Sequence, residues 1–394
     1  MIHSGRGIHD KFGHYSVNNK IFLHKQDAIR EAKFKTENIR FNYNDEWFDC
    51  FDWKTEPEPS VPLSEFYRRR AQFLRDKYDY LILMYSGGPD SKNMLDIYTD
   101  NNIRIDEIVN INSYERTGVS EGTINNADYV YNVKPVLDEL QKRDGFDTKI
   151  TIIDEVDFVK KNWQFYQRTG DVEIMHGSMQ APNNWFTKGN WVRYVPHIWD
   201  KMINGVRVGV VMATDKTPLR LKDGKYYTDF VDLFCVDTAL AFENDQDLRH
   251  IEFLEYFYHS PECVDLIIKQ AHCLKNFVEH NRGSDMYEDP KVYENAKTRV
   301  PHHCYSKHVN GNLKYGPYHK ILYPNWNPCV VTPKEIHMIF RPRDSWFINQ
   351  FTNEERKFWM YGVHQTIKDF KNIVHSNNGL TGFKVLNSKP RFLE

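Results

Sequence analysis

The residue types best suited to chemistry lie together in one short segment, Ser86-Gly87-Gly88-Pro89-Asp90-Ser91. The two glycines let the backbone turn sharply and approach a ligand closely, because neither carries a Cβ. The serines add hydroxyl donors, and Asp90 supplies a carboxylate that can ligate Mg²⁺ or cap a helix. A segment of this kind before a helix is typical of an anion site, where backbone N–H groups point at a phosphate.

The hydrophobic pattern predicts the elements that position this segment. Residues 80–85 form a continuous apolar run of strand length, and a helix is expected from residue 91 to residue 98. Further strands are predicted at 107–111, 149–153 and 206–212, with helices at 64–77 and, in two parts, at 124–143. Apolar strands that alternate with helices predict the α/β class, a mostly parallel twisted sheet with helices on both faces. A loop after such a strand opens into the crevice where ligands bind.

The S-G-G-x-D-S spacing at 86–91 resembles the signature of the PP-loop (N-type) ATP pyrophosphatases, a superfamily with an adenine nucleotide alpha hydrolase-like, HUP-like domain. The strict resemblance covers six residues, and the looser strand and helix layout covers about 65–215. The Walker A pattern is absent from the sequence, and no strand precedes the glycines at positions 5, 7 and 13, which excludes a dinucleotide fingerprint.

The resemblance implies a site for ATP and Mg²⁺. It implies that a substrate oxygen attacks the α-phosphate, that pyrophosphate leaves, and that a nucleophile then displaces AMP from the adenylated intermediate. Mg²⁺ normally neutralises the leaving pyrophosphate. Asp90 is the expected catalytic and metal-binding carboxylate, and Asn110 and Ser113 are expected near the adenine or ribose. The expected pyrophosphate-binding residues are Ser86, Gly87, Gly88, Asp90 and Ser91.

A second candidate pair follows the strand predicted at 206–212. If the strands are parallel, Lys216 can reach the phosphates and Asp215 can bind Mg²⁺ at the same edge of the sheet. The alternative is an ordinary turn with a surface lysine. Asp229 and Asp232 are weaker candidates, which can simply face solvent.

The histidines and cysteines leave the question of a zinc site open. His302, His303, Cys304 and His308 are close in sequence, but zinc ligands usually come in pairs from two places, and no second pair is evident. The six cysteines form no C-x-x-C pair, which favours free thiols in a reducing cytoplasm.

The chain of 394 residues is long enough for two or three domains. We expect a small α+β unit at 1–60, the ATP-binding domain at 61–232, and a mainly helical region at 233–394 that binds a substrate or partner. The first boundary rests on three prolines between 57 and 62, which cannot continue a helix or a central strand. A long helix is predicted at 261–280, after Ser260 as its N-cap. Hairpins are predicted around Asn18-Asn19 and at 219–232, where Asp223-Gly224 form the turn.

Composition excludes several classes of protein. The net charge of −2 gives no electrostatic reason to expect a protein that coats nucleic acid. No stretch approaches the roughly 20 apolar residues of a membrane span, and no apolar segment of a signal peptide is present at the N-terminus. The oligomeric state is not indicated.

Departures from the family pattern narrow the expected reaction. Glutamine-hydrolysing members would have a cysteine at position 2, where this chain has Ile2, and the sulfur-handling members rely on cysteines that are absent here. Ligase or amide-forming chemistry is therefore favoured, with a phosphoadenylylsulfate reductase-like oxidoreductase or a non-catalytic nucleotide-binding protein as alternatives. Segments 215–218 and 268–272 resemble PP-loop proteins of large bacteriophages, which implies nucleotide or nucleic-acid modification in a host cytoplasm. The acceptor substrate is not identified.

Overall fold

The computed structural model describes a little over half of the chain. At 155, 159, 221, 304–308, 311–315, 329–331 and 385–386, only the backbone is described. The described residues are 13–22, 28, 31–32, 39–112, 129–161, 191–192, 195–213, 217–230, 253–280, 304–308, 311–315, 321–323, 325, 329–331, 349–357, 385–386 and 388–394.

A parallel sheet of five strands forms the centre of the described part of the chain. Its spatial order is β10-β7-β4-β5-β6, and every neighbouring pair is parallel. The strands are β4 (Tyr80–Met84), β5 (Glu107–Asn112), β6 (Lys149–Asp154), β7 (Val208–Met212) and β10 (Leu254–Tyr256). The predicted α/β class and the first four strands are thus confirmed. β4, β7 and the first residues of β5 are almost wholly buried, as their continuous apolar runs require.

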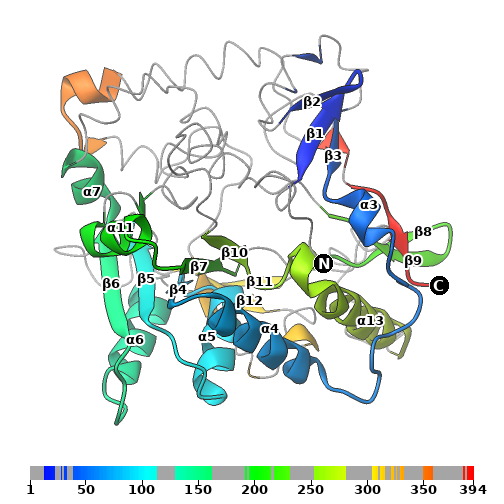
Figure 1. Ribbon diagram of the computed structural model, residues 1–394, viewed down its shortest axis with the longest axis horizontal. Coiled ribbons are helices and arrows are strands. Elements are labelled where there is room, and N and C mark those ends of the chain that lie inside the picture. Colours follow the sequence, from blue (N-terminus) through cyan, green and yellow to red (C-terminus); the bar gives the residue numbers. More distant parts are fainter. Residues whose placement is uncertain are drawn as a thin grey trace.

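Helices pack beside this sheet. α4 packs against α5 on one side and against α13 on the other, and Figure 1 shows these three helices in a row. α11 contacts β7 and lies away from that row (Figure 1). The helices are α3 (Asp45–Phe48), α4 (Leu63–Lys77), α5 (Pro89–Asp100), η1 (Tyr129–Val133), α6 (Lys134–Leu140), α7 (Glu155–Lys161), α11 (Pro196–Ile203), η3 (Pro261–Cys263) and α13 (Val264–His280). The predicted N-cap of the long helix is confirmed, because the Ser260 hydroxyl accepts from the Glu262 N–H at 3.3 Å.

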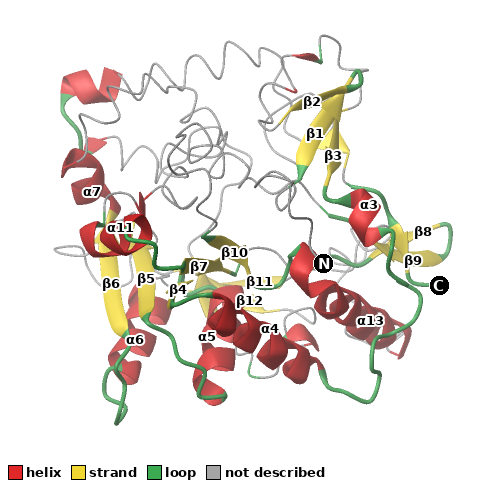
Figure 2. Ribbon diagram, viewed as in Figure 1, coloured by secondary structure: helices red, strands yellow, loops and turns green. Residues whose placement is uncertain are grey.

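Smaller sheets surround the parallel one, and Figure 2 shows the strands of the first of them set apart from it. This first sheet has the order β14-β3-β1-β2, and a second has the order β15-β9-β8. Both predicted hairpins are confirmed, and all four of their turn residues have positive φ. The strands, with those of a third sheet, are β1 (His14–Val17), β2 (Lys20–Phe22), β3 (Ile39–Asn42), β8 (Arg220–Lys222), β9 (Lys225–Thr228), β11 (Cys304–His308), β12 (Gly311–Tyr315), β13 (Cys329–Val331), β14 (Val385–Leu386) and β15 (Arg391–Phe392).

The C-terminal tail returns to two sheets that begin far away in sequence. β14 pairs with β3 in a parallel register, and β15 pairs with β9 in an antiparallel register. The described part of region 233–394 thus holds strands β10 to β15 as well as α13. The prediction of a mainly helical region did not include these strands, because they are short and carry polar residues. The domain boundaries themselves stay a prediction.

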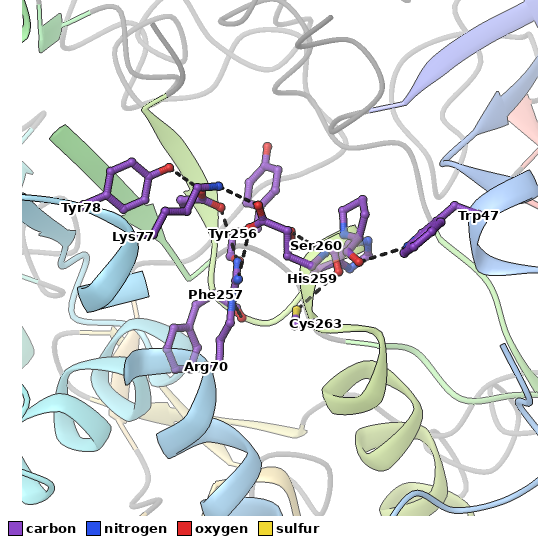
Figure 3. Close-up of polar contacts among 12 residues, drawn as sticks. Trp47, Arg70, Lys77, Tyr78, Tyr256, Phe257, His259, Ser260 and Cys263 are labelled. Carbon is purple, nitrogen blue, oxygen red and sulfur yellow. Dashed lines mark hydrogen bonds and ion pairs between the residues drawn. The ribbon is translucent and has the colours of Figure 1, made fainter. Parts of the chain in front are cut away.

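A buried network of charges fixes β10 to α4. Arg70 donates to the Tyr256 carbonyl at 2.8 Å and lies 3.4 Å from the carboxylate of Glu255. Lys77 Nζ lies 2.9 Å from Glu255 and 2.6 Å from Glu262 (Figure 3). Because Glu255 is fully buried, it needs such partners. A charged residue at the centre of a three-residue strand interrupts the apolar pattern that predicts a strand. β10 was therefore absent from the sequence prediction.

No helix in the described ranges is both long enough and apolar enough to cross a membrane.

Candidate functional site

The glycine-rich loop lies where the order of the sheet reverses. Along the chain, β4 is followed by β5 and then β6 on one side, whereas β7 and β10 lie on the other side of β4. The chain therefore continues from β4 toward one edge of the sheet and from β7 toward the other edge. The loops after β4 and β7 diverge, and ligands bind in the crevice between such loops. Residues 86–91 follow β4 after a single residue, Tyr85, so the loop is placed at this crevice.

The two glycines have different roles in the loop. Gly87 has φ +77°, which a residue with a side chain rarely adopts. Gly88 is the N-cap of α5 with φ −74° and ψ 163°, an extended conformation open to any residue. A Cβ at Gly88 would approach only Ser86 Oγ, at 3.6 Å, among the described atoms. Neither backbone strain nor a contact with the described residues therefore explains glycine at position 88.

Two serine hydroxyls brace the loop. Ser91 Oγ accepts from the Ser86 N–H at 3.3 Å and lies 3.0 Å from the Gly88 carbonyl, to which it can donate. The two hydroxyls are 3.1 Å apart. Ser91 is buried, whereas Ser86 is exposed. The hydroxyl of Ser91 thus holds the loop closed, and the Ser86 hydroxyl is the one at the surface.

Asp90 is held by two tyrosines from distant parts of the chain. The Tyr323 hydroxyl donates to Asp90 Oδ1, and the Tyr258 hydroxyl donates to the Asp90 carbonyl at 2.8 Å. Asn93 in turn donates to the Tyr258 oxygen at 2.8 Å. Burial raises the pKa of both tyrosines well above the usual value, and the charge of Asp90 raises it further, so both stay protonated donors.

Asn110 presents a buried acceptor next to the loop. Its Nδ2 donates to the carbonyl of Tyr85 at 2.8 Å, and this fixes which end of the amide faces the strand. Its Oδ1 is buried and has no hydrogen-bond partner among the residues that the structure describes. A buried acceptor without a donor is costly, so this oxygen is suited to a donor from a ligand.

Several predicted site residues fall outside the described ranges. Ser113 follows β5, and Asp215 and Lys216 follow β7 after Ala213, but none of the three is described. The premise behind the last two is confirmed, because β4 and β7 are parallel neighbours whose carboxyl ends share one edge. Asp232 also lies outside the description. Asp229 is described, and its carboxylate is buried in an ion pair with Arg220 at 2.6 Å.

The histidine and cysteine cluster remains untested. His302 and His303 lie outside the described residues, and Cys304 and His308 are the first and last residues of β11, whose side chains are not described. Within the described residues, no group of three or more His, Cys, Asp or Glu is arranged to hold a metal.

Tyr258 and Tyr323 were absent from the sequence prediction. They contact Asp90 across 168 and 233 residues of chain. No local periodicity or motif marks either residue, so only the fold brings them to the loop.

No family model, no curated protein and no solved structure matches this chain. The site is therefore interpreted from its own geometry.

Proposed function

We propose that residues 86–91 bind the phosphates of ATP and that the protein is an adenylating enzyme that releases pyrophosphate. The observation that carries this proposal is the position of an S-G-G-x-D-S segment at the switch point of a parallel sheet, where its last three residues form the start of α5. The N-terminus of a helix offers N–H groups and the positive end of its macrodipole, both of which favour a phosphate. The open space at Gly88 lets a pyrophosphate approach the backbone closely.

Adenosine would lie against the end of β5. The unpartnered Oδ1 of Asn110 suits the exocyclic amine of adenine or a ribose hydroxyl, because each can donate a hydrogen bond. Ser113, which follows β5 closely in sequence, is proposed to lie in the same part of the site.

Mg²⁺ would be held by Asp90 together with Asp215. Mg²⁺ sites commonly use one or two carboxylates with oxygens of the substrate phosphates, so a dense cluster of protein ligands is not needed. The ion would neutralise charge on the pyrophosphate, and Lys216 would add a positive charge at the same edge of the sheet.

The proposed reaction follows from cleavage at the α-phosphate. A substrate oxygen bonds to the α-phosphorus, the bond from that phosphorus to the bridging oxygen breaks, and pyrophosphate carries away the electron pair. A nucleophile such as an amine then displaces AMP.

We further propose that helices cover both faces of the sheet, as right-handed crossovers on the two sides of β4 require. The region after residue 233 is proposed to bind the acceptor.

Product analysis tests the proposal. The protein is incubated with Mg²⁺, ATP labelled at the α- or γ-phosphate, and pools of carboxylates, amines and nucleotides. AMP with pyrophosphate is the expected result, whereas ADP with phosphate overturns the proposal. Sulfite release from a phosphosulfate nucleotide would instead assign the reductase reaction, and tight ATP binding without turnover would assign a non-catalytic role.

Gly88→Val tests the loop itself. A branched side chain at this position would occupy the space in front of α5, so we expect ATP affinity to be lost while the thermal unfolding midpoint stays close to that of the wild type. Unchanged ATP affinity would show that the loop does not bind the phosphates.

A further inference from the structure

The side chain of Asp90 is oriented by a residue outside the loop. Asp90 is the second residue of α5 and is only half-buried, so its carboxylate borders the open end of the helix. One of its oxygens, Oδ1, accepts a hydrogen bond from the hydroxyl of Tyr323. Tyr323 is 1% exposed, so its ring cannot follow the carboxylate into solvent.

A separate contact fixes the backbone at the same residue. The Tyr258 hydroxyl donates to the Asp90 carbonyl at 2.8 Å and accepts from Asn93 Nδ2 at 2.8 Å. The rings of Tyr258 and Tyr323 pack together with centroids 5.6 Å apart. The side chains of Tyr258 and Tyr323 are also hydrogen-bonded to each other. The two phenols thus form one unit, in which Tyr258 contacts the main chain of Asp90 and Tyr323 contacts its carboxylate.

Tyr258 and Tyr323 contact different parts of Asp90, so the two contacts can have different roles, one in the structure of the segment and one in the site. The main-chain contact is enough to anchor the start of α5. The contact with the carboxylate instead leaves one oxygen fixed in direction, and a carboxylate oriented in this way binds a cation with less loss of side-chain entropy. Carboxylates that ligate metals are commonly held by such outer hydrogen bonds, and their removal typically costs 10- to 100-fold in metal affinity.

We infer that Tyr323 is a positioning residue that orients the Asp90 carboxylate toward the Mg²⁺ of the bound nucleotide. The inference rests on the proposed function of the loop at 86–91. It gives the C-terminal region a direct part in the site, because a residue 233 positions away sets the direction of a loop carboxylate.

The experiment compares nucleotide binding with and without Mg²⁺ in Tyr323→Phe and Tyr258→Phe. Calorimetry gives the affinity for ATP with Mg²⁺ and with EDTA, and a Mg²⁺ titration at a fixed ATP concentration gives the midpoint for Mg²⁺-dependent ATP binding. We expect Tyr323→Phe to bind ATP in EDTA with the wild-type affinity. We expect its Mg²⁺ midpoint to rise by about tenfold or more. Tyr258→Phe removes the same hydroxyl group from the same unit, and we expect its Mg²⁺ midpoint to shift less than that of Tyr323→Phe, because its contact with Asp90 is to the main chain.

The outcomes separate the inference from the proposed function. If the wild type binds no ATP, the proposed function fails. If the wild type binds ATP but Tyr323→Phe keeps the wild-type Mg²⁺ midpoint, the inference alone fails. Equal shifts in the two variants would also overturn it, because they would report a general loosening of α5.

A second measurement avoids any loss of folding in the variants. 3-Fluorotyrosine placed at position 323 keeps the hydroxyl and adds one small atom. With ATP already bound, addition of Mg²⁺ is expected to shift the fluorine resonance at 323 more than the resonance of the same label at 258. No shift at 323 would overturn the inference.

Discussion

The ring of Tyr78 occupies the space in which Gly209 would carry a side chain. A Cβ at Gly209 would lie 2.5 Å from Cγ and 2.9 Å from Cε2 of that ring, and closer still to Cδ2. The ring is held in place because the Tyr78 hydroxyl donates to the buried carboxylate of Glu255 in β10. Gly209 lies in β7, so this contact links β7, its neighbour β10 and the residue that ends α4.

Gly209→Ala is therefore expected to destabilise the fold. Overpacking of a well-filled core costs about 1–3 kcal/mol, so the urea midpoint should fall by the corresponding amount with an unchanged m-value. The control is the same substitution in a Tyr78→Ala background, where no ring has to move and the added loss should be under about 0.5 kcal/mol. An equal loss in both backgrounds would show that the ring is not the cause.

Gly88→Ala should leave stability close to the wild-type value. The backbone at Gly88 suits alanine, and the added Cβ meets only Ser86 Oγ at ordinary contact distance among described atoms. Loss of glycine freedom in the unfolded chain favours the folded state by about 0.4–1 kcal/mol, and this gain is offset because an N-cap position prefers glycine to alanine. ATP affinity should fall, because the methyl group lies where the phosphates approach. Denaturation and calorimetry on one protein sample check both effects, and retained affinity would contradict the assigned ligand.

The sequence predicted the parts of the fold that depend on local pattern. The apolar run at 80–85 and the glycines after it identified β4 and the loop. A strand buried on both faces requires consecutive apolar residues, and a sharp turn requires glycine. β10 was missed because Glu255 interrupts its apolar pattern, and its charge is compensated by Arg70 and Lys77 of α4. Tyr323 was missed because its contact with Asp90 exists only in three dimensions. The roles of Glu255 and Tyr323 depend on the residues that they contact in the folded chain, and not on their neighbours in sequence.

Acid should destabilise the protein through His259. This side chain is 1% exposed, and within the described part of the chain neither of its ring nitrogens has a hydrogen-bond partner. Its ring packs against Tyr43 at 4.8 Å and Phe230 at 4.6 Å between centroids. Burial lowers the pKa of His259 to about 3 from a usual value of 6.5. Between these two values the unfolded chain binds a proton that the folded chain does not, so stability falls as the pH is lowered from about 6.5 toward 3.

The size of this effect can be measured as a difference between variants. His259 should account for a loss of about 2 kcal/mol between pH 7 and pH 5, since each pH unit below 6.5 contributes about 1.4 kcal/mol. Urea denaturation at both pH values should show this loss in the wild type and a loss smaller by that amount in His259→Phe. Identical pH dependence in the wild type and His259→Phe would contradict the prediction.

The last prediction concerns the C-terminal strand. The guanidinium carbon of Arg391 in β15 lies 5.2 Å from the ring centroid of Phe48, 5.4 Å from that of Trp53 and 5.3 Å from that of Phe230. Its Nη2 donates to Asp45 Oδ1 at 2.8 Å, and the arginine side chain is 2% exposed. One residue of the tail thus joins the N-terminal unit, through α3, to the residues that follow β9.

Arg391→Met should lower the free energy of unfolding by about 3 kcal/mol, because it removes the guanidinium from a mostly buried carboxylate and from three aromatic rings. Lys389→Met is the matched control in the same tail. Its ion pair with Asp49, 2.7 Å long, is solvent-exposed, and such pairs contribute about 0–1 kcal/mol. Urea denaturation of the two variants should therefore differ by about 2 kcal/mol or more. Equal losses would mean that Arg391 adds no more to stability than a surface charge.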